Sequence, residues 1–427
     1  MSEKLLLRGG SVLTLGAKTA NFARADVLLA GGTVAGIGAA VRARDAEVVD
    51  ATDTIVMPGF VDTHRHAWSA LLRNLGGTTA PEDVRAHYRP DDVYAGTLIA
   101  LLGAAEAGIT TVVDWSDVAH DDDLAAAALR AHADAGLRTV LVTETGEGAR
   151  ERVARLREAA GPLTTIALGT RADGRDDLDR AAADRELARE LGLRLHVHAG
   201  AAAGPGVVAG LAAKGLLADD VTLVHHTGLD EADLDAIRSS GAAVSLAPSS
   251  EMTDGLGAPP IQQLIDRDLR PGLGVDHERW SPGDLFAQMR AAISMQHATV
   301  FDRKLAGKGA LPRLLSTRDV IRWATVDGAR VAGLDGVTGS LEVGRAADVV
   351  VLRTDRPNIF PINDPIGAVV WGMDTSNVDR VIVGGRDLVR DGALQTDVAH
   401  VRETAFAARD RVAGAAGLVV AGAGGGR

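Results

Sequence analysis

The chain has 427 residues, a formal net charge of −12 at pH 7 and no cysteine. This length allows one large α/β barrel with attachments or two to three ordinary domains. Without cysteine there is no disulfide, no Cys-ligated zinc and no thiol nucleophile, so any metal must be held by histidines and carboxylates. The acidic balance argues against binding to nucleic acid or to an anionic membrane, and it favours a small-molecule partner.

The expected secondary structure changes twice along the chain. Residues 1–54 begin with strands at Leu5–Leu15, Asp26–Leu29 and Thr33–Ile37. Eight apolar or β-branched runs follow, at Ile55–His66, Thr110–Trp115, Thr139–Thr145, Thr164–Thr170, Arg194–Gly200, Val221–Thr227, Ala243–Ser249 and Arg270–His277. Helical periodicity separates them, as in Asp122–Ala135, Glu151–Ala160, Asp177–Leu191 and Asp230–Ser239. Strands return at Val349–Leu352, Val381–Val383 and Arg386–Val389.

This order predicts a barrel and a smaller domain. Eight strands that alternate with helices over about 250 residues indicate a (β/α)8 TIM barrel, here residues 55–338. The strands of the two ends are expected to pair into one small β-sandwich, formed by residues 1–54 and 339–400. Residues 401–427 are expected to be a C-terminal helix and a flexible tail.

Neither a leader nor a membrane span is expected. The first residues lack the continuous apolar core and cleavage site of a signal peptide. No uncharged run reaches the roughly 20 strongly apolar residues of a membrane helix, and the nearest, Val412–Gly426, is mostly Ala and Gly. We therefore expect a cytoplasmic protein without a membrane partner, and we expect it to form a homo-oligomer, namely a dimer.

Histidines gather at the carboxyl ends of the expected barrel strands, which is the rim where such barrels build their sites. His64 and His66 end the first strand, and residues two apart on a strand face the same way. His196 and His198 repeat this spacing on the fifth strand, His225 lies near the end of the sixth, and Asp276 lies near the end of the eighth. Such nitrogen and oxygen ligands suit zinc or another divalent ion that activates water, and a nearby carboxylate can move the proton.

These motifs resemble the amidohydrolase superfamily, in the branch of cytosine deaminase, guanine deaminase and the triazine chlorohydrolases. The resemblance rests on PGFVDTHRH, HVH, VHH and GVDH in this order, with GSLEVGRAADVVVL and VDRVIVGGRDLVRDG in the C-terminal part. It implies a metal-bound hydroxide that attacks a carbon bonded to nitrogen or, less often, to another leaving group. It also implies that His64, His66, His198 and Asp276 bind the metal, that Asp276 is the general base, and that His225 orients the hydroxide or polarises the substrate.

Two departures from the family pattern narrow the expected chemistry. Deaminases of this branch carry a glutamate three residues after the His198 position, where it moves protons at the ring nitrogen and the leaving amine, but here that residue is Ala201. Members with two metals use a carboxylated lysine on the fourth strand, and none of the five lysines lies on strands two to five. One metal ion is therefore expected, with zinc ahead of iron or manganese, and a glutamate-bridged pair of metals is the alternative.

The sequence indicates the substrate-binding residues less clearly than the metal ligands. Trp68, His196, Glu251 and Trp280 are the candidate substrate-binding residues, each with a packing or supporting role as the alternative. Asp276 alone can make both proton transfers that amide hydrolysis needs, first as a base and then as an acid. The leading hypothesis is therefore a mononuclear zinc hydrolase that cleaves an amide or cyclic amide C–N bond of a small or short peptide-like molecule. Deamination of a nucleobase-like or other N-heterocycle is the alternative. A degenerate barrel that binds a ligand without turnover is the third hypothesis.

Overall fold

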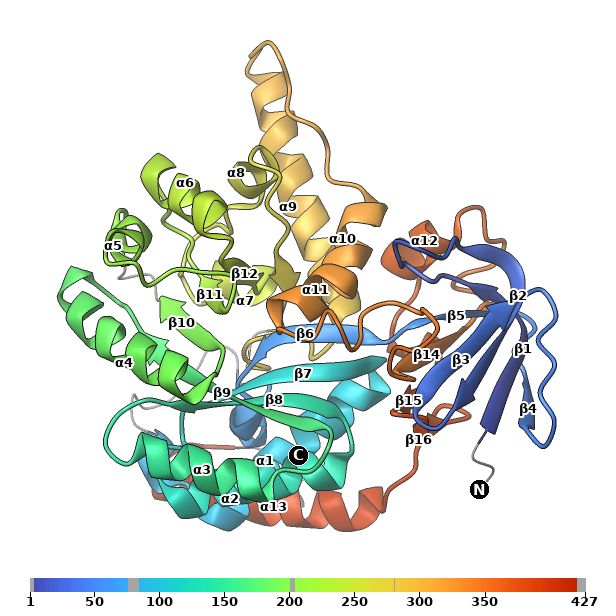
Figure 1. Ribbon diagram of the computed structural model, residues 1–427, viewed down its shortest axis with the longest axis horizontal. Helices are drawn as coiled ribbons and strands as arrows, with labels where there is room; N and C mark the ends of the chain where they lie inside the picture. The colour runs from blue at the N-terminus through green and yellow to red at the C-terminus, as the bar shows by residue number, and fades with distance from the viewer. Residues whose placement is uncertain (1–3, 76–83, 200–203, 280, 421–427) are drawn as a thin grey trace.

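The computed structural model describes residues 4–75, 84–199, 204–279 and 281–420 (Figure 1). Eight parallel strands pair in chain order into the barrel sheet. They are β6 (Phe60–Arg65), β7 (Ile109–Ser116), β8 (Arg138–Glu144), β9 (Thr164–Arg171), β10 (Leu195–Ala199), β11 (Val221–His225), β12 (Ala243–Leu246) and β13 (Gly272–Leu273). The predicted TIM barrel is therefore confirmed.

Main-chain bonds close the barrel between its first and last strands. The amide of Val275 donates to the carbonyl of His64 at 3.1 Å, and the amide of His66 donates to the carbonyl of Asp276 at 3.1 Å. Since β13 has only two residues, most of this closure lies in the segment that follows it. The seam between the ends of the barrel thus runs through residues that the sequence assigned to the metal site.

Helices cover the outside of the barrel. The longer ones are α1 (Pro90–Glu106), α2 (Asp122–Ala135), α3 (Ala149–Ala159), α4 (Leu178–Leu191), α6 (Glu231–Ser240) and α9 (Leu285–Leu305). Shorter ones are η1 (Ala67–Leu72), η2 (Val84–His87), α5 (Val207–Ala213), α7 (Pro248–Thr253), α8 (Ile261–Ile265), α10 (Thr317–Trp323) and α11 (Val326–Val331). The acidic run at Asp121 caps the start of α2, where the Asp121 carboxylate accepts the amides of Asp123 and Leu124.

The terminal segments form a separate sheet of nine strands beside the barrel. From the N-terminal side come β1 (Lys4–Val12), β2 (Phe22–Ala30), β3 (Thr33–Gly38), β4 (Glu47–Asp50) and β5 (Thr54–Pro58), and from the C-terminal side β14 (Val349–Arg353), β15 (Val378–Val383), β16 (Arg386–Arg390) and β17 (Ala393–Leu394). Leu7, Val27 and Val56 share one buried cluster with Val351 and Ile382. Both ends of the chain therefore build this domain, as predicted.

The run expected as one strand over 55–66 is two strands. β5 pairs with β1 and β14 in the terminal sheet, whereas β6 belongs to the barrel. Gly59 lies between them, and a Cβ atom at this position would come within 2.1 Å of Cγ2 of Thr110. The chain therefore crosses from one sheet to the other at a position that only glycine fits.

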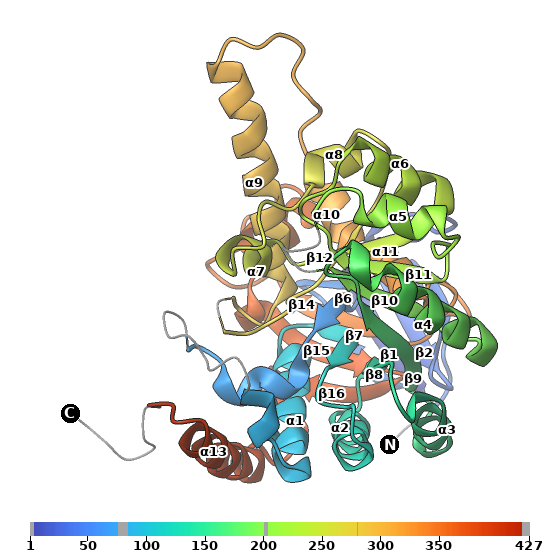
Figure 2. The ribbon, with the colours of Figure 1, turned by 90° about the vertical axis from the view of Figure 1, so that its left-hand side faces the viewer.

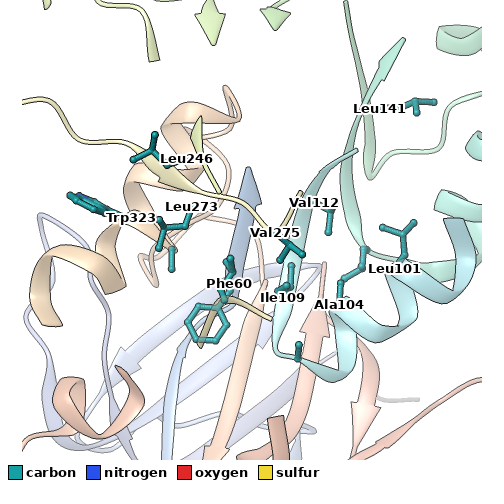
Figure 3. Close-up of a cluster of buried hydrophobic side chains, with 14 of the residues drawn as sticks. Phe60, Leu101, Ala104, Ile109, Val112, Leu141, Leu246, Leu273, Val275 and Trp323 are labelled. Atoms are coloured by element: carbon teal, nitrogen blue, oxygen red, sulfur yellow. The ribbon is translucent and has the colours of Figure 1, made fainter. Parts of the chain in front are cut away.

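The core lies between the barrel strands and their helices, and Figure 3 shows part of it around Phe60 and Ile109 of the first two barrel strands. Phe60 and Phe286 meet edge to face at 5.0 Å between ring centroids. At the other end of the chain, α13 (Val398–Ala415) packs beside α1 (Figure 2), where the Arg411 guanidinium donates to Asp92 at 3.0 Å. Within the described ranges, no helix has the length and apolarity to cross a membrane.

Candidate metal centre and active site

The histidines and the aspartate predicted from the sequence converge at one end of the barrel. Each stands at or just after the carboxyl end of its strand, and parallel strands bring these ends to the same rim. The ring centroids of His64 and His198 are 5.5 Å apart, and that of His225 lies 5.1 Å from His64 and 4.8 Å from His198. Residues from four separate strands thus form one buried cluster.

Their ligand atoms point toward a common space. Nε2 of His64 and Nε2 of His66 each lie 3.4 Å from Oδ1 of Asp276. One ligand atom each from His64, His66 and His198 fall within 4.8 Å of one another, and so do those of His64, His225 and Asp276. Three imidazole nitrogens and one carboxylate oxygen are donors that suit Zn²⁺ and related divalent ions.

The hydrogen bonding of this cluster fits a cation. Both ring nitrogens of His64, Nδ1 of His198 and Oδ1 of Asp276 are buried without a hydrogen-bond partner in the described part of the chain. Buried polar atoms normally have partners, so these atoms are free to bind an ion or water. Burial lowers the pKa of His64 to about 3 and that of His198 well below its usual value, which keeps both rings neutral as metal ligands must be.

Asp276 is held in its charged form. Burial acts to raise its pKa, but the neighbouring histidines, His277 and His64 foremost, bring it well below the usual value. The Ser250 hydroxyl donates to Oδ2 of this carboxylate. Oδ1 is left for the space shared with the histidine nitrogens, and an ionised carboxylate there can accept a proton.

The orientation of the His66 ring is fixed by contacts at its Nδ1 atom. Its Nδ1 lies 3.1 Å from the main-chain carbonyl of Trp115, which calls for a proton on Nδ1 and leaves the Nε2 lone pair free. Oδ1 of Asp117 also lies 3.6 Å from Nδ1. Burial acts to lower the pKa of His66, and the Asp117 carboxylate outweighs it and raises that pKa.

Helix α7 supports two predicted catalytic groups from adjacent positions. Ser250 contacts Asp276, and Oε1 of Glu251 lies 3.0 Å from Nδ1 of His225. The same Oε1 accepts the amide of Ala247 at 2.9 Å. With Nδ1 held in this way, Nε2 of His225 faces the site, 4.0 Å from Oδ2 of Asp276.

Three site residues adopt left-handed backbone conformations. His225, His226 and Asp276 have φ values of 68°, 65° and 64°. Such conformations cost non-glycine residues about 1–3 kcal/mol, and they persist where the surrounding structure enforces them. Here the turn at each strand end aims the His225 and Asp276 side chains inward, while Nδ1 of His226 bonds to the carbonyl of Val224 at 2.8 Å.

Arg65 lies between the two histidines of β6 and ties the seam of the barrel together. Its guanidinium donates to Asp62 at 2.7 Å, to Glu278 at 2.5 Å and to the carbonyl of Gly283 at 2.8 Å. Asp62 in turn accepts the amide of Val275 at 3.1 Å. Arg65 therefore connects the first strand to the segment that bears Asp276.

The proposed substrate-binding residues have different surroundings. Trp68 is buried in the core, with its ring edge to face with Tyr88 at 4.9 Å. His196 is fully buried one layer below His198, and neither of its ring nitrogens has a hydrogen-bond partner among the described residues. Glu251 holds His225, and Trp280 and Ala201 lie outside the described residues. A substrate-binding role for these residues stays a prediction.

Sequence reasoning missed three residues beside the cluster. Ser250 contacts Asp276, and Asp117 contacts His66. The His277 ring stacks on that of His66 at 4.3 Å between centroids. His277 directly follows Asp276, so its place in the chain was a usable signal. Asp117 and Ser250 stand after their strands end, where the alternation of a strand no longer indicates direction.

Lysine placement agrees with a site that needs no lysine bridge. The five lysines lie on β1, in the loop after it, at the end of α5, at the end of α9 and just beyond α9; they are Lys4, Lys18, Lys214, Lys304 and Lys308. All of them lie among the described residues and none is on a barrel strand.

A barrel with a His and Asp cluster at the carboxyl rim defines a metal-dependent hydrolase. The chain belongs to the amidohydrolase family, whose sequence model matches residues 55–388. The predicted family is therefore confirmed, and with it the prediction of a metal-dependent enzyme that hydrolyses C–N bonds.

Curated and solved proteins resemble the chain over nearly its whole length. A 5'-deoxyadenosine deaminase from Methanothermobacter thermautotrophicus is 28% identical, over 97% of this chain and 100% of that protein. The zinc-bound structure of an adenosine deaminase from Xanthomonas campestris is 23% identical with a TM-score of 0.80, and covers 96% of this chain and 98% of that one. An atrazine chlorohydrolase from Arthrobacter aurescens, complexed with zinc, is 21% identical with a TM-score of 0.82, over 95% and 100% of the two chains.

Proposed function

We propose that this protein is a mononuclear zinc hydrolase that cleaves a C–N bond of a small molecule. The observation that supports it most is the buried cluster of His64, His66, His198 and Asp276, in which ring nitrogens of His64 and His198 and Oδ1 of Asp276 have no hydrogen-bond partner among the described residues. A divalent ion held by these residues would polarise water and the substrate at neutral pH. Asp276 would accept a proton from the attacking water and return it to the leaving nitrogen.

His225 has a separate task in this scheme. Its Nε2 faces the space in front of Asp276, while Nδ1 is held by Glu251. It would orient the water or polarise the oxygen of the substrate. The Ser250 hydroxyl keeps the Asp276 carboxylate in one rotamer, so that Oδ1 stays directed at the histidine nitrogens.

The number of side chains that can transfer protons favours an amide or a cyclic amide as the substrate. Hydrolysis at a carbonyl carbon needs one group that first takes and then gives a proton, which Asp276 provides. Ring deamination also needs protonation of a ring nitrogen, and the family's glutamate for this step is Ala201 here. Glu251, one carboxyl group of the site, is already bonded to His225 and to the amide of Ala247.

Deamination of an adenosine-like or other N-heterocycle is the second candidate. The names of the relatives favour it, since a 5'-deoxyadenosine deaminase matches almost the entire chain. Glu144 is the carboxyl group that could take over the missing proton transfer. Its Oε1 lies 3.2 Å from Nε of Arg171 and 3.3 Å from Nε1 of Trp115 at the barrel rim.

A paired substrate screen separates these candidates. Zinc-loaded protein would be incubated with amides, lactams and hydantoin-like rings on one side and with aminopurine nucleosides and aminoazines on the other, and products would be read by mass. Ring opening or two fragments would support amide hydrolysis, and ammonia release with one oxygen gained would support deamination. Hydrolysis of neither set by a protein that retains no divalent ion would favour the non-catalytic barrel.

A further inference from the structure

Several arginines around the metal cluster are neutralised by acids of the same region. Arg65 and Arg73 share the carboxylate of Glu278, at 2.5 Å and 2.9 Å between nitrogen and oxygen atoms. Arg171 lies 3.3 Å from Asp117 in the same sense. These cations therefore serve the protein's own acids and are not free for a ligand.

Arg279 differs from these arginines. It follows Asp276 by three residues, in a turn beyond β13, and it is half-buried. It has no ion pair or hydrogen bond in the described part of the chain. Acids outnumber lysines and arginines by 57 to 45, so a shortage of acids does not explain this. Because a cation that has lost part of its hydration without gaining an acid is unfavourable, this placement indicates a binding role.

The charge of Arg279 acts on three groups around the entrance of the site. Burial has the largest effect on each of them, since it lowers the pKa of His277 and raises the pKa of Asp254 and of Tyr88. The Arg279 guanidinium acts to lower all three pKa values. These groups stand just after β13, α7 and η2, so Arg279 lies among three segments that surround the metal cluster.

Neutral donors without partners lie on the η2 side of this entrance. The Tyr88 hydroxyl and Nε1 of Trp68 are buried, and neither has a hydrogen-bond partner within the described ranges. Their rings meet edge to face at 4.9 Å, and Trp68 follows the predicted ligand His66 by two residues. These donors are free to bind an acceptor that a ligand brings.

We propose that Arg279 and the Tyr88 hydroxyl bind a carboxylate of the substrate, which is then an amide or a cyclic amide that carries an acid group. The guanidinium has two parallel N–H donors that match the two oxygens of a carboxylate. One free cation suits a single negative charge better than the nearly two charges of a phosphate monoester. This inference deepens the proposed function, and it rests on that function for the bond that is cleaved.

Binding of matched probes to the zinc-loaded protein tests this subsite. The probes are N-acetylglycine, N-benzoylglycine and pyroglutamic acid, each paired with its neutral primary amide, and binding is measured by isothermal titration calorimetry at low ionic strength. The acid of at least one pair is expected to bind at least about 10-fold more tightly than its amide. In Arg279→Gln this ratio should fall to about 1–2, with the melting temperature and zinc content of the wild type.

Two other variants calibrate this result. Arg303→Gln, at the exposed end of α9, removes the same charge away from the site and should keep the wild-type ratio. Arg279→Lys keeps the charge without the paired donors and should keep part of the preference. Equal binding of acid and amide by the wild type in all three pairs would overturn the proposal. A preference for acids that survives in Arg279→Gln would also overturn it, because the acid group would then lie on the metal ion.

The Tyr88 hydroxyl has its own test. Tyr88→Phe should not lower the melting temperature, because the hydroxyl has no partner among the described residues, and it should weaken binding of the acid by about 2- to 10-fold. The chain has two tyrosines, and Tyr94→Phe is the matched control, since the Tyr94 hydroxyl donates to Asp134 at 2.8 Å on the outer helices. Unchanged acid binding in Tyr88→Phe would overturn a subsite made by both groups.

These measurements do not depend on turnover. Acid binding that requires Arg279, in a protein that hydrolyses none of the amides, would contradict the proposed function and would still support the carboxylate subsite. Failure of the subsite and failure of the proposed function are therefore distinguishable.

Discussion

Glu251 is expected to act through His225, and its removal gives the sharpest test of the site. Its carboxyl group is fully buried and contacts two donors, Nδ1 of His225 at 3.0 Å and the amide of Ala247 at 2.9 Å. A buried donor left without a partner costs about 1–3 kcal/mol. Glu251→Ala should therefore lower the free energy of unfolding by about 2–6 kcal/mol, whereas Glu251→Gln, which keeps an acceptor at the same place, should lower it by less.

Substitution of Glu251 is also expected to lower the catalytic rate. Glu251→Gln replaces a charge-assisted hydrogen bond to His225 with a neutral one, and the difference of about 1–1.5 kcal/mol corresponds to a fall of roughly 5- to 13-fold in kcat/KM. Steady-state kinetics on zinc-loaded Glu251→Gln, with zinc content measured by mass spectrometry, gives this value. The zinc content should equal that of the wild type, because Glu251 is not among the proposed ligands.

A double-variant cycle decides whether Glu251 works through His225. In a His225→Ala background, Glu251→Gln should have little further effect on kcat/KM, since the group that it positions is gone. Equal losses in the two backgrounds would refute the positioning role and would return Glu251 to the candidates for substrate binding. Ser249→Ala, on the same short helix, is the control for a general disturbance of α7.

Three further variants give distinct outcomes. Burial lowers the pKa of His226 to about 4, so the folded protein disfavours the protonated ring. The full free energy of unfolding is present above pH 6.5, and about 3 kcal/mol of it is lost as the pH falls toward 4. His226→Gln should flatten this part of the stability profile in urea melts of the metal-free protein. Asp276→Asn should reduce kcat by at least about 100-fold, and full activity in the metal-loaded variant would exclude Asp276 as the base. Ala201→Glu restores the carboxyl group of the family's deaminases and should increase ammonia release from aminopurine nucleosides, with Ala201→Gln as the control.

Much of the metal cluster could be predicted from the sequence because it depends on short-range geometry. Residues two apart on a strand share a face, which pairs His64 with His66, and the strand ends of a barrel meet at one rim. The chemistry of the donors then follows from residue type. Asp276 was predictable by the same logic, although β13 is only two residues long and Asp276 follows it rather than ending it.

The supporting residues could not be predicted, because they depend on how segments approach one another. Ser250 and Glu251 reach Asp276 and His225 from a helix after the seventh strand, and neither spacing nor alternation indicates that approach. The break between β5 and β6 was hidden for a similar reason. Gly59 interrupts a run that is apolar on both sides, and its need for glycine comes from the distant Thr110.

The closure of the barrel and the geometry of the metal site depend on the same atoms. The carbonyl of His64 accepts the amide of Asp276 at 2.8 Å, and the carbonyl of Asp276 accepts the amide of His66 at 3.1 Å. These bonds hold Asp276 in its left-handed conformation, and they set the 3.4 Å distances from its Oδ1 to both histidines. A substitution that loosens the seam, such as Asp62→Ala below Arg65, is therefore expected to weaken metal binding before it unfolds the barrel.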